Sequence, residues 1–108
     1  MNLENAAVRS DGVVFHTVEC VLRQLNPTNG EVTGFFELEE GVQIPRGLPN
    51  LRIEGSVPLE VKLLSSVITS GGKRRYRFVA VCDNDAISSL DLMMNAAKHP
   101  TILEDMMH

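Results

Sequence analysis

Two stretches of alternating apolar and polar residues, joined by a five-residue turn sequence, constrain the fold of this chain more than any other feature. The first is VVFHTVECVLRQL (residues 13 to 25) and the second is EVTGFFELEE (residues 31 to 40). A period of two places successive side chains on opposite faces of a β-strand. The intervening NPTNG ends in Asn-Gly, which tolerates the positive φ of a tight turn. The pattern therefore predicts an antiparallel hairpin with one face in a core.

The alternation also predicts which side chains of the hairpin face that core. They are Val14, His16, Val18, Cys20 and Leu22 on the first strand, and Val32, Gly34, Phe36 and Leu38 on the second. Further strands are predicted at 51–57, 59–68 and 73–82, after a loop at 41–50 that is rich in proline and glycine. Phe36 and Phe78 lie at the centres of their alternating runs. We expect these two rings to anchor the core.

The period then changes from two to about 3.6, which predicts a helix over residues 86–98. Its apolar stripe consists of Ile87, Leu90, Met93, Met94 and Ala97. Acidic residues precede the helix and Pro100 ends it. Thr101 followed by Glu104 forms a capping box, which predicts a second short helix in the tail.

Residues 1–108 are thus predicted to form a single α+β domain. It comprises an N-terminal tail (1–12), a β-sheet (13–82) and a C-terminal helical segment (83–108). The sheet should contain about five mostly antiparallel strands, in a curled sheet or a small open barrel, followed by a C-terminal helix and a short helical tail. With 44% hydrophobic and 22% charged residues, the chain has the composition of a folded domain.

Charge and composition exclude several classes of function. A formal net charge of −4 makes nucleic acid an unlikely partner and disfavours anionic membranes. No apolar run approaches the roughly 20 residues that cross a bilayer, and the N-terminus lacks a secretory signal, so we expect a cytoplasmic protein without membrane contact. The two cysteines follow no metal-binding spacing. We expect no metal and no cofactor.

The best candidate for ligand binding is KRRYR, which holds four of the ten Lys and Arg residues. Lys73, Arg75 and Arg77 should project from one face of a strand, with Tyr76 on the other. Such residues could bind a small anion or a nucleotide. The interpretation we favour is a solvated strand that pairs with Glu37, Glu39 or Glu40 of a neighbouring strand.

A Cys-His enzyme is the third alternative. Positions four apart on a strand are separated by about 13 Å, so His16 cannot contact Cys20 directly. Only Cys82 could meet His16 across the sheet. We favour a core histidine with two buried thiols, assign no catalytic residue, and expect a protein that is not an enzyme.

The C-terminal segment predicts an oligomer. Five apolar residues, Leu92, Ile102, Leu103, Met106 and Met107, lack a partner in the predicted fold. A tail of about two turns is too short to form a helix alone in water, so it must either fray or dock, on its own sheet or on a second subunit. Methionine adapts to irregular partner surfaces. We therefore expect a small binding or assembly module that acts through a protein-interaction surface, most simply as a homodimer.

Overall fold

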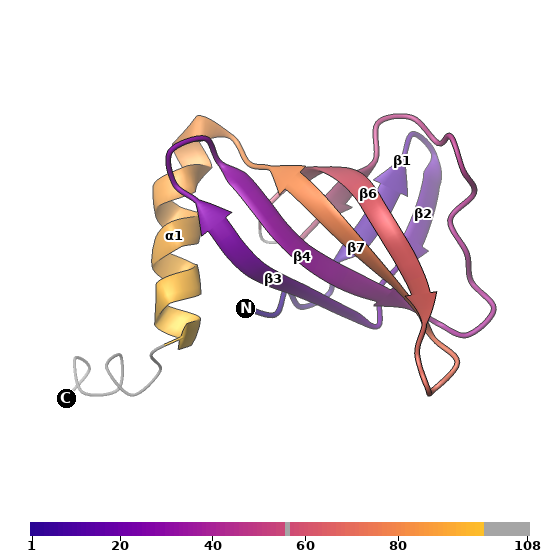
Figure 1. Cartoon of the computed structure of the whole chain (residues 1–108). Coiled ribbons are helices and arrows are strands. Elements are labelled where there is room, and N and C mark those ends of the chain that lie inside the picture. Colours follow the sequence, from indigo (N-terminus) through magenta and orange to yellow (C-terminus); the bar gives the residue numbers. More distant parts are fainter. Residues whose placement is uncertain (56, 99–108) are drawn as a thin grey trace.

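A computed structural model describes residues 1–55 and 57–98 as one sheet and one helix (Figure 1). The strands are β1 (Ala7–Ser10), β2 (Val13–His16), β3 (Glu19–Asn26), β4 (Glu31–Leu38), β5 (Arg52–Glu54), β6 (Leu59–Ile68) and β7 (Arg74–Val81), and the helix is α1 (Asn84–Lys98). In the part of the chain that is described, no helix is both long enough and apolar enough to cross a membrane. The second helix predicted in the tail lies outside the described residues.

All strand pairs are antiparallel, in the order β2-β1-β5-β6-β7-β4-β3. The predicted α+β class and antiparallel sheet are confirmed, but the count of about five strands is wrong, because residues 1–55 and 57–98 already form seven. Residues 7–10, which we assigned to an N-terminal tail, form β1 between β2 and β5. This strand is only four residues long, with one large apolar side chain, Val8, so its alternation is too short to detect.

The strand predicted over residues 13 to 25 is in fact two strands, β2 and β3. At the break, the Thr17 amide and hydroxyl both donate to the Ala6 carbonyl, at 3.2 and 2.7 Å. The next amide, that of Val18, donates to the Glu37 carbonyl at 2.8 Å. The chain therefore changes partner between two successive residues.

This break changes which residues of the alternating pattern face the core. In β3, Cys20 and Leu22 are buried as predicted. On the N-terminal side of the break, Val14 and His16 are exposed, and Val18, the first residue after the break, is exposed as well. Phe15 packs against the core instead. The prediction that Val14, His16 and Val18 face the core is wrong, because the alternation does not continue through the break.

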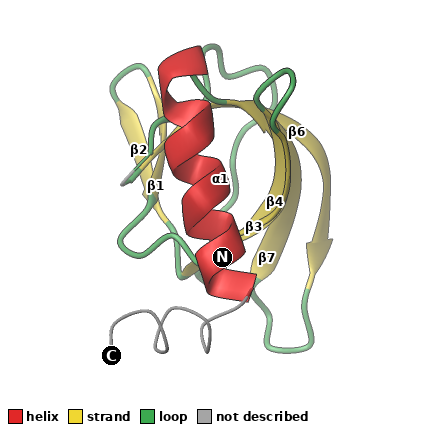
Figure 2. Ribbon diagram, turned by 90° about the vertical axis from the view of Figure 1, so that its left-hand side faces the viewer, coloured by secondary structure: helices red, strands yellow, loops and turns green. Residues whose placement is uncertain are grey.

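The sheet is open, with β2 and β3 at its edges, and it curls strongly so that α1 lies across its concave side (Figure 2). The N-terminus runs along the outer edge of β3. The Leu3 amide donates to the Cys20 carbonyl, and the Met1 ammonium group donates to the Leu22 carbonyl, both at 2.8 Å. Residues 1–3 therefore protect part of an edge that would otherwise be free.

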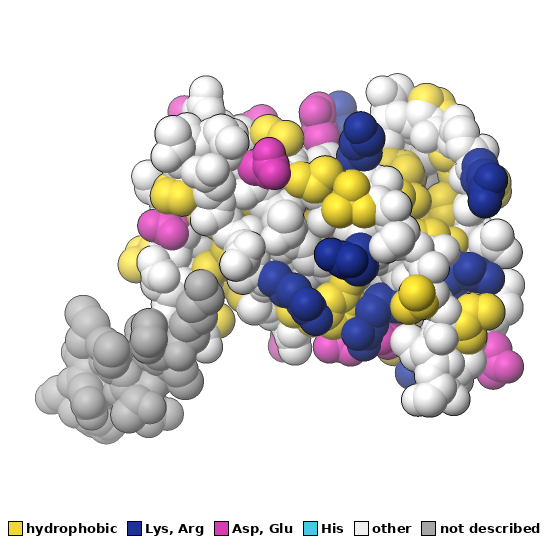
Figure 3. Space-filling view, in the orientation of Figure 1, with side chains coloured by type: hydrophobic (Ala, Val, Ile, Leu, Met, Phe, Trp, Pro, Cys, Tyr) yellow, Lys and Arg dark blue, Asp and Glu magenta, His cyan; other side chains and the backbone are white. Residues whose placement is uncertain are grey.

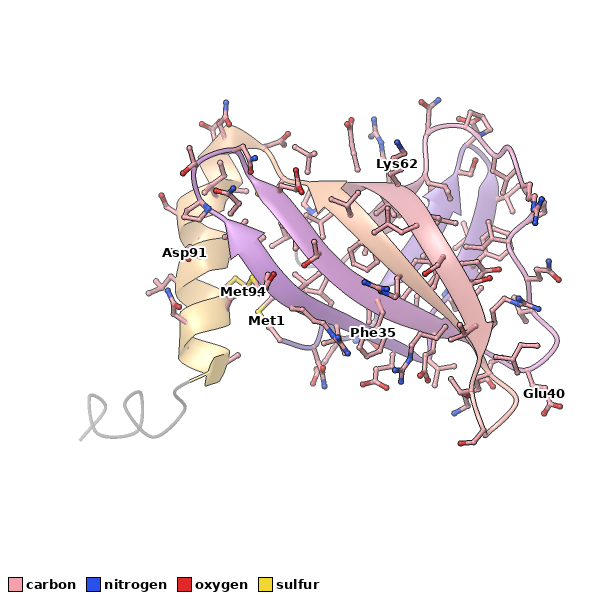
Figure 4. All side chains as sticks on the ribbon, in the orientation of Figure 1. Met1, Phe35, Glu40, Lys62, Asp91 and Met94 are labelled. Carbon is pink, nitrogen blue, oxygen red and sulfur yellow. The ribbon has the colours of Figure 1, made fainter. Side chains whose placement is uncertain are left out.

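The core fills the space between the curled sheet and α1. The Phe36 ring lies 5.3 Å from the Tyr76 ring and 5.9 Å from the Phe78 ring, centroid to centroid. The helix contributes Leu90 and Met94, and Met94 lies beside Met1 between α1 and β3 (Figure 4). Both predicted ring anchors are buried.

The apolar stripe predicted on the helix is too wide. Met93 and Ala97 are exposed, whereas Leu90 and Met94, which are one turn apart, are buried. The concave side of the sheet contacts the helix mainly along this one row of side chains, and the neighbouring row faces outward.

Candidate functional site

The basic sequence KRRYR lies at the start of β7, and its alternate side chains serve different faces of the sheet. Tyr76 is buried on the concave side, and its hydroxyl oxygen accepts a hydrogen bond from the Ile44 amide at 2.9 Å. Arg75 and Arg77 project from the convex side, opposite Glu37 and Phe35 of β4. Lys73 precedes the strand, in the turn from β6. Of the four candidates, only Arg75 and Arg77 line one common surface.

Arg75 has an acidic partner. Its Nε and Nη2 atoms donate to Oε1 of Glu37, at 2.9 and 2.6 Å. The Glu37 side chain is only 10% exposed, and the Arg75 guanidinium lies 4.1 Å from the centroid of the Phe35 ring. The pairing with Glu37 that we favoured from the sequence is therefore present for Arg75.

A third arginine, Arg23, joins this surface from β3. The pairing of β3 with β4 shifts between Leu22 and Gln24, which makes Arg23 the extra residue of a β-bulge. Its guanidinium lies 5.0 Å from the Phe35 ring centroid. Arg23, Arg75 and Arg77 line a hollow of about 140 Å³. We call these three residues the arginine face.

The space-filling view shows Lys and Arg side chains gathered over the middle of the sheet with hydrophobic side chains between them (Figure 3). Arg23 could not be identified from the sequence, because a bulge in β3 and the order of the strands place it on the same surface as Arg75 and Arg77. Only the strand register reveals this contact.

We expect Arg75→Gln to lower the free energy of unfolding by about 1–3 kcal/mol, because the nearly buried Glu37 carboxylate would lose its charged partner. Arg77→Gln removes the same charge from the same face of the same strand. In the described residues Arg77 has no acidic side chain within 4.0 Å, so this variant should change stability by less than about 0.5 kcal/mol. Urea denaturation followed by circular dichroism measures both. Equal losses in the two variants would contradict a structural role for the ion pair.

A second candidate surface is the edge of β6 that faces away from β7. On this side β5 pairs only with Leu59 and Glu60, and the Val61 amide donates to the Leu51 carbonyl at 2.9 Å. From Lys62 to Ile68, no strand among residues 1–55 and 57–98 pairs with this edge. It is the longest free stretch of β6.

The direction of the free amides follows from the alternation of hydrogen bonds along an antiparallel strand. The Val61 amide points away from β7, so the Leu63 amide does too. Beyond the shift in pairing at Leu64, the Thr69 amide donates to the Lys73 carbonyl on the β7 side. The amides of Ser66 and Ile68 must then point to the free side. Three donors are available there: those of Ser66 and Ile68 have the two-residue spacing of a strand, and the shift in pairing at Leu64 separates them from that of Leu63.

The loop from 41 to 51 lies opposite this edge, at the end of the molecule remote from α1 (Figure 1). It is held in place by Ile44, which is buried against Tyr76, and by the Ser10 hydroxyl, which donates to the Pro49 carbonyl at 2.5 Å. Loop and strand enclose an open groove of about 900 Å³, here called the β6 groove. Its lining includes four basic side chains, Arg46, Arg52, Lys62 and Arg74, and one acidic side chain, Glu60.

Apolar side chains lie exposed along the same strand. Leu64, Val67 and Ile68 are 55%, 57% and 64% exposed. An apolar and unpaired edge is a template for pairing with another chain, and monomeric proteins usually protect such edges. The strand and its apolar residues were predicted from the sequence. The short length of its neighbour β5, which is only three residues long, was not.

Leu92 is the one residue of the predicted oligomer interface that lies among the described residues, and its side chain is 72% exposed on α1. Ile102, Leu103, Met106 and Met107 lie outside the described residues. The contact that we predicted between Leu92 and the tail of a second subunit stays a prediction.

The two cysteines and His16 come from different parts of the fold: Cys20 from β3, Cys82 from the residue after β7, and His16 from β2. Burial raises the pKa of the Cys20 thiol to about 12, and burial also raises the pKa of Cys82, with the charge of Asp83 adding to the effect. A thiol with a raised pKa is protonated at neutral pH and is a poor nucleophile. His16 is exposed on β2, which three strands separate from β7 in the sheet. Within residues 1–55 and 57–98, no three His, Cys, Asp or Glu side chains gather in a way that could hold a metal ion.

Comparisons with protein-family models, with curated proteins and with solved structures found no match. The function has to be inferred from the geometry of this chain alone.

Proposed function

We propose that this protein is a non-enzymatic cytoplasmic binding module that takes up an extended segment of a partner protein along the free edge of β6. The observation that carries the proposal is the unpaired edge from Lys62 to Ile68, of which residues 62–66 line a groove of about 900 Å³. Addition of a strand to an exposed sheet edge is a common mode of peptide recognition. Main-chain hydrogen bonds supply affinity in this mode, and side-chain pockets supply specificity.

The groove favours a single extended segment over the edge of a second sheet. Loop 41–51 forms the opposite wall and is anchored through Ile44 and Pro49. An isolated strand fits between β6 and this loop, whereas a second sheet would bring neighbouring strands against the loop.

The charges of the β6 groove specify the chemistry of the partner. Four basic side chains against one acidic side chain leave a net charge of +3, in a protein whose formal net charge is −4. Complementary charge accelerates encounter and selects partners. The exposed side chains of Leu64 and Val67 add apolar contact area beside the free edge. The partner segment should therefore alternate acidic with aliphatic residues.

Selection from a displayed library of random decapeptides against the parent protein, followed by titration of the selected peptides, tests this function. We expect enrichment of acidic and aliphatic residues in alternation. Ser66→Pro removes a free-side amide without breaking a bond to β7, since proline is tolerated on strand edges. It should weaken binding of the selected peptides by about tenfold or more, the effect of roughly 1.4 kcal/mol.

Two controls separate strand addition from other modes of binding. Leu92→Ser changes an exposed apolar residue on α1 and should leave peptide affinity unchanged. N-methylation of alternate peptide amides blocks strand pairing without altering the protein, so it should abolish binding in one of the two possible phases. Selected peptides that bind Ser66→Pro as tightly as the parent and tolerate N-methylation in both phases would refute the proposal, as would a selection that yields no binder.

The homodimer remains a second proposal. It is supported by the exposure of Leu92, which lies on a face of α1 that the sheet does not cover.

A further inference from the structure

We propose that the arginine face is an anion site that binds a phosphate group. It is a different surface from the β6 groove, and the two share only Leu64 among their lining residues. Either proposal can therefore be refuted without affecting the other.

The arginine face carries more positive than negative charge. Three guanidinium groups line a hollow of about 140 Å³, and in the described residues only Arg75 has an acidic side chain within 4.0 Å. Like charges held close together repel one another, and the repulsion is relieved when an anion binds between them. Glu37 offsets one of the three positive charges, which leaves two for a ligand.

Two of the three guanidinium groups, those of Arg75 and Arg23, are held in place before any ligand arrives. Arg75 is fixed by two hydrogen bonds to Glu37 and by its contact with the Phe35 ring. Arg23 lies on the same ring, and Figure 4 shows nitrogen-bearing side chains around Phe35. All three arginines come from paired strands of one sheet. Side chains that are already ordered lose less conformational entropy on binding.

The N–H donors of the arginine face match the oxygens of a phosphate group. A guanidinium group presents paired N–H donors in a plane, which fit the oxygens of a phosphate group in a bidentate manner. Arg23 and Arg77 each have such donors without an acidic partner in the described residues, and Thr33 adds a hydroxyl group to the lining.

The size of the hollow limits which ligands the arginine face can bind. Sites for drug-sized molecules occupy about 300–1,000 Å³. A hollow of about 140 Å³ admits a phosphate group and excludes a base and its sugar. The Phe35 ring is also covered by two guanidinium groups, so it offers no free face for stacking a base. The phosphate group itself is the ligand, whether free or carried by a small molecule.

Isothermal titration with inorganic phosphate at low ionic strength tests the site, with Arg77→Gln as the key variant. Loss of one charge-assisted contact should weaken phosphate binding by about tenfold or more. Arg74→Gln is the matched control, since it removes the same charge from the same strand, three residues from Arg77 and on the opposite face. Its affinity for phosphate should stay within about twofold of the parent.

A nucleoside monophosphate in a second titration should bind with the affinity of inorganic phosphate, because its base stays outside. Amide chemical shifts of Thr33 and Phe35 should move during both titrations. The site is refuted if the two variants weaken binding equally, which indicates a general effect of net charge, or if phosphate does not bind at low salt. A monophosphate that binds more than tenfold tighter than phosphate would refute the assignment of the phosphate group as the whole ligand.

Discussion

Gly34→Ala should destabilise this protein by about 3 kcal/mol or more, a large part of the roughly 5–15 kcal/mol that stabilises a typical domain. Gly34 lies in β4 opposite Leu22, where the bulge at Arg23 brings β3 close to it. A Cβ atom there would meet the Val21 carbonyl oxygen at far below contact distance, with the Leu22 Cα atom at 3.2 Å. Both obstacles are backbone atoms of a paired strand. The clash cannot be relieved by turning a side chain.

Gly12→Ala is the matched control for this prediction. Gly12 lies in the turn between β1 and β2, where an added Cβ has nothing within 4 Å, and it is not among the glycines with positive φ. Its stability should stay within about 0.5 kcal/mol of the parent. Equilibrium unfolding in urea gives both values. If Gly34→Ala unfolds at the same urea concentration as Gly12→Ala, the close approach of β3 and β4 is wrong.

Phe36→Ala should cost about 3–5 kcal/mol, the usual range for a phenylalanine removed from a core. The side chain is fully buried in β4. It contacts the rings of Tyr76 and Phe78, so its removal leaves a cavity and breaks two aromatic pairs. We expect a marginally stable or unfolded variant, measured as a large fall in the melting temperature and the loss of near-ultraviolet circular dichroism.

Leu64→Ala provides the comparison, because that side chain is 55% exposed on β6. It should cost less than about 1 kcal/mol. A Phe36→Ala variant that melts within a degree or two of the parent would show that the concave side of the sheet is not the core.

The sequence predicted the parts of the fold that depend on neighbours along the chain. The alternation in residues 31 to 38 identified the buried face of β4, where Val32, Phe36 and Leu38 are all inaccessible to solvent. Asn29-Gly30 marked the turn, and Gly30 has a φ of +75°. The helix was recognised from its period, and Leu90 and Met94 are buried on the expected side. In each case the signal lies within one strand, one turn or one helix.

The errors in the fold have a common cause, which is contact between residues far apart in the sequence. Hydrogen bonds from Thr17 to Ala6, and from Val18 to Glu37, end one strand and begin the next inside an uninterrupted alternating pattern. Because the period of a strand is two, the break at this point moved Phe15 to the core side in place of His16. No local preference at these residues predicts such a change.

The candidate sites also have parts that were predictable from one strand and parts that depend on distant contacts. The sequence by itself determined that Arg75 and Arg77 share a face and that Tyr76 lies on the other, because this needs only the alternation of one strand. The addition of Arg23 to that face required the bulge in β3 and the order of β3, β4 and β7. The free edge of β6 required the pairing with β5 to stop after Glu60. The sequence specified which side chains each strand carries on each face, and only the tertiary structure decided which strands lie side by side and where their pairing ends, because register and strand order depend on the packing of the whole sheet.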